Sequence, residues 1–467
     1  MTGRSLLLLM ALVHMCLTPV AVAQPGSKEQ AERVVGFVPA HLKAASRSRS
    51  PQAAAAIDDD NSLKAVQQIE FVLSGDSPAH GFEIIDPTME SIETEPGLGE
   101  SEFVFPVEQM EPTVYGCPLL WGRAEYLLWW TDGMQVPALA TSSPAGTLVG
   151  DAGVLGQTGT SILFGNEGLN DQSRSGGRFT LGSWFDPRRC EGLEFTYLML
   201  GRERQSFSAS NIEFPILARP FFNVVANAQD ARRIAFPAEV SGSLDIQAST
   251  SLQAFEALYR VGGTSAPCQR LSYVLGYRYA ELKDRIGIRE STLALSGALA
   301  GTTFDLLDDF RTQNQFHGGE LGIVMECQSC AGWSLETVAK VALGSTRSRV
   351  SVFGETTTTI GAASTTTQAG LLALPTNIGT VEQSYFSTVS EFGITMRRYS
   401  QCGLSVSFGY TFLYWSDVAR AGDQIDVGIN TSQIPPGALT GLARPVVPFD
   451  KGDFWAQGLR CGLDYAF

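Results

Sequence analysis

Apolar and polar positions alternate with a period of two along most of the chain. Between residues 453 and 467, Trp455 begins a mostly apolar series at every second position, while Gly458 and Arg460 belong to an alternate series of small or polar residues. This is the period of a β-strand, because successive side chains of a strand point to opposite sides. The segment is therefore predicted to be one long strand that ends on the aromatic Phe467.

The same alternation recurs and predicts ten strands. Their approximate bounds are 119–131, 177–185, 192–201, 250–261, 270–282, 313–326, 333–344, 383–399, 403–415 and 453–467. These strands are 9 to 17 residues long, which is enough to cross a bilayer at a tilt.

The connections between these strands alternate between short and long. Short turns are predicted at 186–191, 262–269, 327–332 and 400–402, and long stretches at 132–176, 202–249, 283–312, 345–382 and 416–452. Short turns at one end and long loops at the other are typical of outer-membrane barrels. A closed barrel also satisfies every backbone hydrogen bond within lipid.

The predicted fold is thus all-β: a single-chain antiparallel transmembrane β-barrel of about ten strands (8–12). Its short turns would be periplasmic and its long loops extracellular. An even number of strands would put both ends of the barrel on the periplasmic side. A soluble β-sandwich or soluble barrel, with the apolar face turned into a core, is the alternative interpretation.

The N-terminal quarter has a different character. Arg4, the apolar stretch 6–17 and the small-residue site at 21–23 predict a signal peptide over 1–23, and hence export to the outer membrane. Residues 24–111 are predicted to be an acidic, mostly disordered arm, since 57–111 alone carries a net charge of −13. The barrel is assigned to 112–467.

Composition narrows the function classes. The net charge is −15 at pH 7, so no basic surface for nucleic acid is expected. Only 17% of residues are charged and 48 are Gly, which suits many strands and turns. After the N-terminus no apolar run reaches the roughly 18 residues of a spanning helix, and a helical membrane protein is not expected.

Several motifs in this order resemble the β-barrel porin family of planctomycete bacteria. They are the segment Glu125-Tyr126-Leu127-Leu128-Trp129-Trp130, then 276–279, 309–316 with Gly318, 377–379, 409–416 leading into 420–426, and Phe454-Trp455-Ala456-Gln457-Gly458. The similarity extends over about 112–467. It implies an outer-membrane barrel with a porin-like role, but no solute.

The small and polar faces of the strands would point into the barrel. They predict a set of pore-lining charges: Arg123, Glu125, Arg178, Glu194, Glu256, Arg260, Arg278, Glu320, Glu336, Lys340, Glu391, Arg397, Arg460 and Asp464. A ten-strand barrel is narrow compared with open porins of about sixteen strands. These charges either pair and fill the interior or line a narrow, gated pore. The apolar loop segment 214–225 is expected to fold inward.

Cysteines gather at the predicted turns. Six are candidates for disulfides on the periplasmic side: Cys117, Cys190, Cys268, Cys327, Cys330 and Cys402. Cys461 would be the odd thiol of the exported chain. A zinc or redox site at Cys327 and Cys330 is less well supported, because a tight hairpin offers neither four ligands nor the basic neighbours that lower a thiol pKa.

No catalytic motif, metal site or cofactor site is predicted, and the chain is not expected to be an enzyme. A hydrolase built on this barrel would have to use His317, which is more simply a strand histidine. Two functions remain: passive or gated passage of small solutes, or a plugged barrel with a structural or surface-interaction role. Expected partners are outer-membrane lipid, the barrel-assembly machinery through Phe467, and periplasmic or cell-surface material.

Overall fold

The computed structural model describes residues 119–467 except 267–268, 330–331, 401–402 and 436. The predicted signal peptide and the acidic arm lie outside the described residues. Within the described part, no helix is long and apolar enough to cross a membrane.

Ten antiparallel strands form a closed ring, which confirms the predicted fold class and strand count. In ring order they are β1 (Leu120–Thr131), β6 (Arg174–Trp184), β7 (Glu191–Ser210), β10 (Val240–Ala266), β11 (Gln269–Ala294), β12 (Thr302–Gln328), β13 (Trp333–Ile360), β15 (Gly379–Tyr399), β16 (Leu404–Val418) and β18 (Gly452–Ala466). β18 pairs with β1 and closes the ring between its first and last strands.

The apolar face of each strand points outward over the half of the barrel nearer the short turns. On β11, the Leu275 side chain is 64% exposed, whereas Arg278, on the opposite face, is fully buried. Such a surface suits lipid, and it rules out the soluble arrangement in which the apolar face forms the core. We call the end with the short turns the short-turn end and the other the long-loop end.

Six strands are longer than the alternation over the lipid-facing part predicted. β7, β10, β11, β12, β13 and β15 run on toward the long-loop end, so much of 283–312 and 345–382 is strand rather than loop. The physical reason is an exchange of polarity between the two faces. On β11, Ile286 and Ile288 are now fully buried, while Arg285 and Arg289 face outward.

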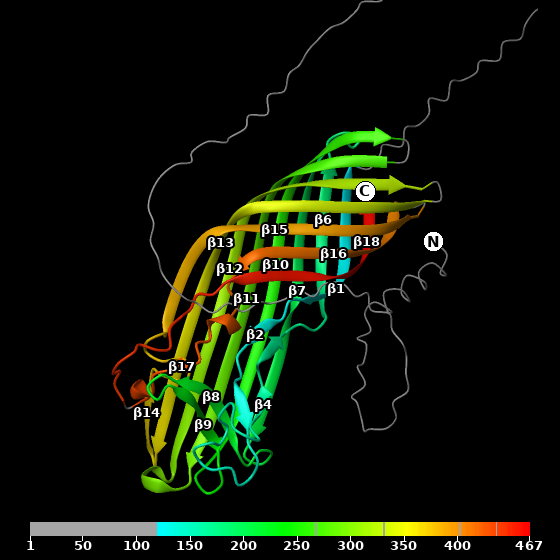
Figure 1. The fold of residues 1–467 in the computed structure, drawn as a ribbon. Coiled ribbons are helices and arrows are strands. Elements are labelled where there is room, and N and C mark those ends of the chain that lie inside the picture. The colour runs from blue at the N-terminus through cyan, green and yellow to red at the C-terminus, as the bar shows by residue number, and fades with distance from the viewer. Residues whose placement is uncertain (1–118, 267–268, 330–331, 401–402, 436) are drawn as a thin grey trace, which may run out of the picture. The chain divides into compact units, whose positions relative to one another are not determined.

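The remaining loops fold against the inside of this extended wall (Figure 1). Their strands are β2 (Met134–Val136), β3 (Ala140–Ser142), β4 (Ser161–Phe164), β5 (Glu167–Leu169), β8 (Leu217–Asn223), β9 (Ala228–Ala235) and β17 (Gly428–Ile429). β14 (Ala363–Thr367) instead pairs with the end of β13 at the edge of the wall and is exposed. Three short 3-10 turns complete the described elements: η1 (Gly297–Leu299), η2 (Gly422–Gln424) and η3 (Thr431–Gln433). A small sheet has the order β17-β8-β3-β4, with β9 beside β8.

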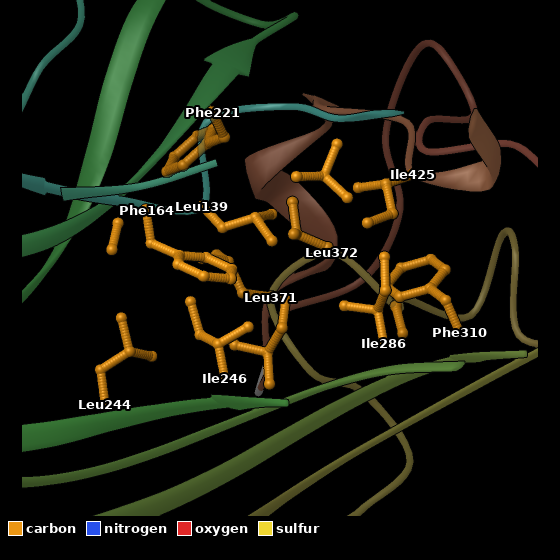
Figure 2. Close-up of a cluster of buried hydrophobic side chains, with 14 of the residues drawn as sticks. Leu139, Phe164, Phe221, Leu244, Ile246, Ile286, Phe310, Leu371, Leu372 and Ile425 are labelled. Carbon is orange, nitrogen blue, oxygen red and sulfur yellow. The ribbon is translucent and has the colours of Figure 1, made fainter. Parts of the chain in front are cut away.

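A large apolar core joins the loops to the wall. Figure 2 shows loop residues, among them Phe221 and Leu371, facing Ile246 and Ile286 of the barrel strands. Segment 214–225 thus folds inward, as expected: Leu217 is fully buried and Phe221 nearly so. We call this core and its loops the loop domain.

Candidate functional site: the barrel interior

The fourteen charged residues predicted for the inner face form ion pairs with one another. Seven are basic and seven are acidic, so the set is electrically balanced. The pairs are Arg123 with Glu336 and Asp464, Arg178 with Glu391, Arg260 with Glu194, Arg278 and Lys340 each with Glu256, Glu320 and Glu391, Arg397 with Glu336 and Asp464, and Arg460 with Glu125. We call this set the ionic layer.

Arg278 is the centre of the ionic layer. Its side chain is fully buried and its Nη2 meets three carboxylates, from Glu256, Glu320 at 2.9 Å and Glu391 at 2.5 Å. Lys340 of β13 supplies a second cation to these three carboxylates, with its Nζ 2.5 Å from Glu256. Buried charges of this kind are tolerated only when each is neutralised by partners.

A second group lies nearer the short-turn end. Arg123 Nε is 2.5 Å from Asp464 and its Nη1 is 3.3 Å from Glu336, which also faces Arg397. A hollow of about 240 Å³ opens to the outside at this mouth. Farther in, the void among the charged side chains is only about 40 Å³. A cavity of about 10–15 Å³ is enough for one water molecule, so this void has room for only about three of them.

An apolar layer follows the ionic layer. It draws side chains from nine of the ten strands, and we call it the apolar layer: Leu127, Trp129, Leu198, Leu200, Leu252, Ala254, Ala280, Leu282, Phe316, Ala342, Val389, Leu413, Trp415, Val418, Phe454 and Ala456.

Four aromatic side chains fill the middle of the apolar layer. Trp129, Phe316, Trp415 and Phe454 are all fully buried. The rings of Phe316 and Trp415 meet edge to face, with centroids 6.1 Å apart, and the Trp415 indole donates to Thr346 Oγ1 at 3.0 Å. Large aromatics in such contacts leave little free space, because protein interiors pack as densely as organic crystals.

Beyond the apolar layer, polar side chains tie the loops to the wall. Arg420, from the loop after β16, donates through Nε to Asp284 Oδ2 at 2.6 Å. The Asn314 side chain on β12 makes two hydrogen bonds to the backbone of Ala419. Its Nδ2 donates to the Ala419 carbonyl at 2.8 Å, and its Oδ1 accepts from the Ala419 N–H at 2.9 Å. The sequence analysis did not select these residues. Asp284 and Asn314 do continue the inward alternation of their strands, and that was the available signal.

A further fully buried tie is made by Asp308 on β12. Its Oδ1 accepts from the backbone N–H groups of Leu371, Leu372 and Ala373 at 2.8–3.0 Å. Its Oδ2 is 2.5 Å from Arg219 Nη2, and both side chains are almost completely buried. One carboxylate thus fixes the turn 370–374 and neutralises the arginine of β8.

The predicted disulfides stay predictions. Among the described residues, Cys190 and Cys327 form none. Cys117, Cys268, Cys330 and Cys402 lie outside the described residues. Of the six candidates, the described Cys190 and Cys327 lie at the short-turn end, where the sequence placed them.

His317 faces outward rather than into the barrel. Its Nδ1 is 2.5 Å from the Tyr277 hydroxyl, and its ring packs against Tyr279 with centroids 5.0 Å apart. It therefore belongs to an aromatic group on the outer surface. Rings with one polar tip commonly occupy the membrane boundary in this way.

The family of the chain follows from residues 121–467, which match the model of the putative beta barrel porin-7 family. The chain belongs to this family. The resemblance to a β-barrel porin family is thereby confirmed, whereas the planctomycete origin stays a prediction. A member of the beta barrel porin-7 family with this ring of lipid-facing strands is an outer-membrane barrel.

Solved outer-membrane barrels are only distantly similar to this beta barrel porin-7 member. The protease OmpT from Escherichia coli is 8% identical, with a TM-score of 0.35, over 75% of this chain and 97% of that one. A Pseudomonas aeruginosa FadL homologue is 8% identical, with a TM-score of 0.20, over 75% and 90%. These likenesses carry no argument about function. The chain matches none of the curated proteins with which it was compared.

Proposed function

We propose that this protein is a closed outer-membrane barrel that anchors the loop domain at the cell surface and conducts no solute in the described state. The observation that carries the proposal is the apolar layer, which draws side chains from nine strands across the interior. Hydrated solutes do not cross such a layer, because they would lose their water without gaining polar partners. In this proposal the role is structural or surface-interacting, and not catalytic.

The ionic layer supports the same proposal. Its charged side chains pair with one another and so do not face a solute, and the void among them is about 40 Å³. Passage of small solutes, the first expectation from the sequence, would require the aromatic side chains of the apolar layer and the loop domain to move aside together. The geometry therefore favours the plugged alternative.

A swelling assay with liposomes tests this proposal. We expect the refolded wild-type protein to give no more swelling in a small sugar than empty liposomes do. The double variant W129A/W415A removes two fully buried indoles from the apolar layer, but the ionic layer and the loop domain still close the interior, so this variant should admit no sugar either. Because each removal costs about 3–5 kcal/mol, the variant must first be shown to fold by its heat-modifiable migration.

The matched control is W130A/W455A, which removes two indoles from the outward alternation of β1 and β18. It should leave the liposomes impermeable. Rapid swelling with the wild-type protein would contradict the proposal, and swelling with the folded W129A/W415A variant would mean that the ionic layer and the loop domain do not close the interior by themselves.

We further propose that assembly machinery recognises the C-terminal Phe467. Its side chain is 66% exposed, and its ring packs edge to face on Tyr465 at 4.9 Å. Its backbone N–H donates to Leu120 O at 2.9 Å, which ties the last residue to the first strand. These contacts support a terminal aromatic that is held at the seam of the barrel yet accessible from outside.

A further inference from the structure

The outer surface of the barrel changes from apolar to basic within a few residues. On β11, Tyr277 is 41% exposed and faces outward, and six residues later the Lys283 side chain is 47% exposed on the same face. The same change occurs on β7, where Met199 is followed by the outward-facing Arg202 and Arg204. This change places the boundary of the lipid-facing band at one level on neighbouring strands.

On the long-loop side of this boundary, basic residues lie side by side across the strands. Ser249 of β10 is opposite Arg204 on one side and Arg285 on the other, and Arg285 is opposite Arg311. Like charges directly opposite each other destabilise a sheet. An anion bound to a surface that keeps them in this register would offset their repulsion. We call Arg204, Arg285 and Arg311, together with Arg202 and Arg289 on the same outer faces of β7 and β11, the arginine row.

One carboxylate on the same outer face, Asp309 of β12, serves two of these guanidiniums. Asp309 is 2.5 Å from Arg285 Nη2 and 2.7 Å from Arg311 Nη2. Burial would raise the pKa of Asp309, but hydrogen bonds from Arg311 and Arg285 hold it below its ordinary value, so the carboxylate is charged at neutral pH. The arginine side chains are still 47% and 58% exposed, which leaves them donors for an external ligand.

The arginine row borders two adjoining hollows of about 390 and 440 Å³ on the outer wall. Small residues line both hollows: Ser249 lies in each, Gly287 in the first and Ser251 in the second. The charged lining is mostly basic, although Asp245 also lines the first hollow and Asp284 the second. The basic side chains include Arg202 and Arg285 in both hollows, Arg204 and Arg289 in the first, and Lys283 and Arg311 in the second.

We propose that the arginine row binds the phosphate groups of a lipid in the membrane leaflet at the long-loop end. The shape and charge both fit. Guanidinium groups recognise phosphate through paired, charge-assisted hydrogen bonds. Toward the short-turn end, at and beyond the level of the polar pair Gln253 and Glu281, an apolar surface is offered to acyl chains by Met199, Phe255 and Tyr277, which are 46%, 38% and 41% exposed. A lipid carries phosphate groups that match the basic surface toward the long-loop end and acyl chains that match the apolar surface toward the short-turn end. A free phosphate would use only the basic surface. This inference is independent of whether the interior conducts.

Native mass spectrometry of the refolded mature protein tests the inference, with diphosphorylated lipid A in detergent as the probe. We expect the wild type to retain the lipid, and R204Q/R289Q to bind it at least about tenfold more weakly. A second variant, R285Q/D309N/R311Q, removes Asp309 together with its two partners, so no buried carboxylate is left without a partner. It should show a similar loss.

The control variant R188Q/R233Q removes the same net charge as R204Q/R289Q at sites away from the arginine row. It should bind within about twofold of the wild type. Dephosphorylated lipid should bind as weakly to the wild type as the phosphorylated lipid binds to R204Q/R289Q. Equal retention of both lipids, or equal loss in the control variant, would overturn the inference. Complete displacement by millimolar inorganic phosphate would overturn the lipid assignment and indicate a free-phosphate site.

Discussion

Replacing Arg278 with methionine is expected to destabilise the barrel by about 3–5 kcal/mol, the range found when one partner of a buried ion pair is removed. The three carboxylates that share Arg278 would keep only Lys340 as a common partner. Their mutual repulsion in a poorly hydrated interior should then oppose folding. The measurement is the urea midpoint of the refolded protein in detergent, followed by the loss of heat-modifiable migration.

A matched control is R233A. Arg233 pairs with Glu239 at 3.7 Å, and both side chains are more than a third exposed. A solvent-exposed pair of this kind contributes roughly 0–1 kcal/mol, so the urea midpoint should move little. Equal midpoints for R278M and the wild type would mean that the ionic layer is not the neutralised network described here.

Replacing Asp308 with alanine is the second change for which we expect a large effect. It removes the partner of the buried Arg219 and the acceptor of three buried N–H groups at once. Leaving buried donors and a buried charge without partners costs about 3–5 kcal/mol. The loss should fall on the loop domain, because Asp308 lies beyond the apolar layer.

Hydrogen exchange locates this effect. In D308A, the amides of residues 371–373 should exchange at least about a hundredfold faster, while those of β1 and β18 keep their protection. The control is D305N on the same strand, where Asp305 is exposed and the amides of 371–373 should be unaffected. Unchanged exchange at 371–373 in D308A would contradict the role of Asp308 as the tie between β12 and this turn.

The positions of the ten strands could be predicted because each one carries its own alternation. Local pattern also selected the inward charges: Glu125 and Arg178 are directly opposite each other on β1 and β6, and both point inward. The structure brings all fourteen selected residues together, while their pore-lining role stays a prediction. That they neutralise one another depends on which strands are neighbours, and the sequence left that open.

The lengths of the strands were underestimated for a physical reason. The alternation was interpreted with lipid outside, so outward arginines such as Arg285 and Arg289 indicated a loop. Ile286 and Ile288 between them continue the strand with the polarity of the two faces exchanged. The sequence predicts this exchange if the barrel wall is assumed to extend beyond the membrane and to enclose an apolar core.

The loop domain could not be predicted from local pattern, because its contacts join residues far apart in the chain. Arg219 and Asp308 are separated by 89 positions, and Asn314 and Ala419 by 105. Neither partner of such a pair stands out among its neighbours. Only the folded wall brings them together.

Single-channel conductance of the refolded mature protein in a planar bilayer tests the central claim, that the interior is closed. The account predicts a folded, heat-modifiable barrel with no discrete conductance steps in the wild type. Discrete wild-type steps whose size depends on salt would contradict it, because they would require a continuous aqueous path past Trp129, Phe316, Trp415 and Phe454.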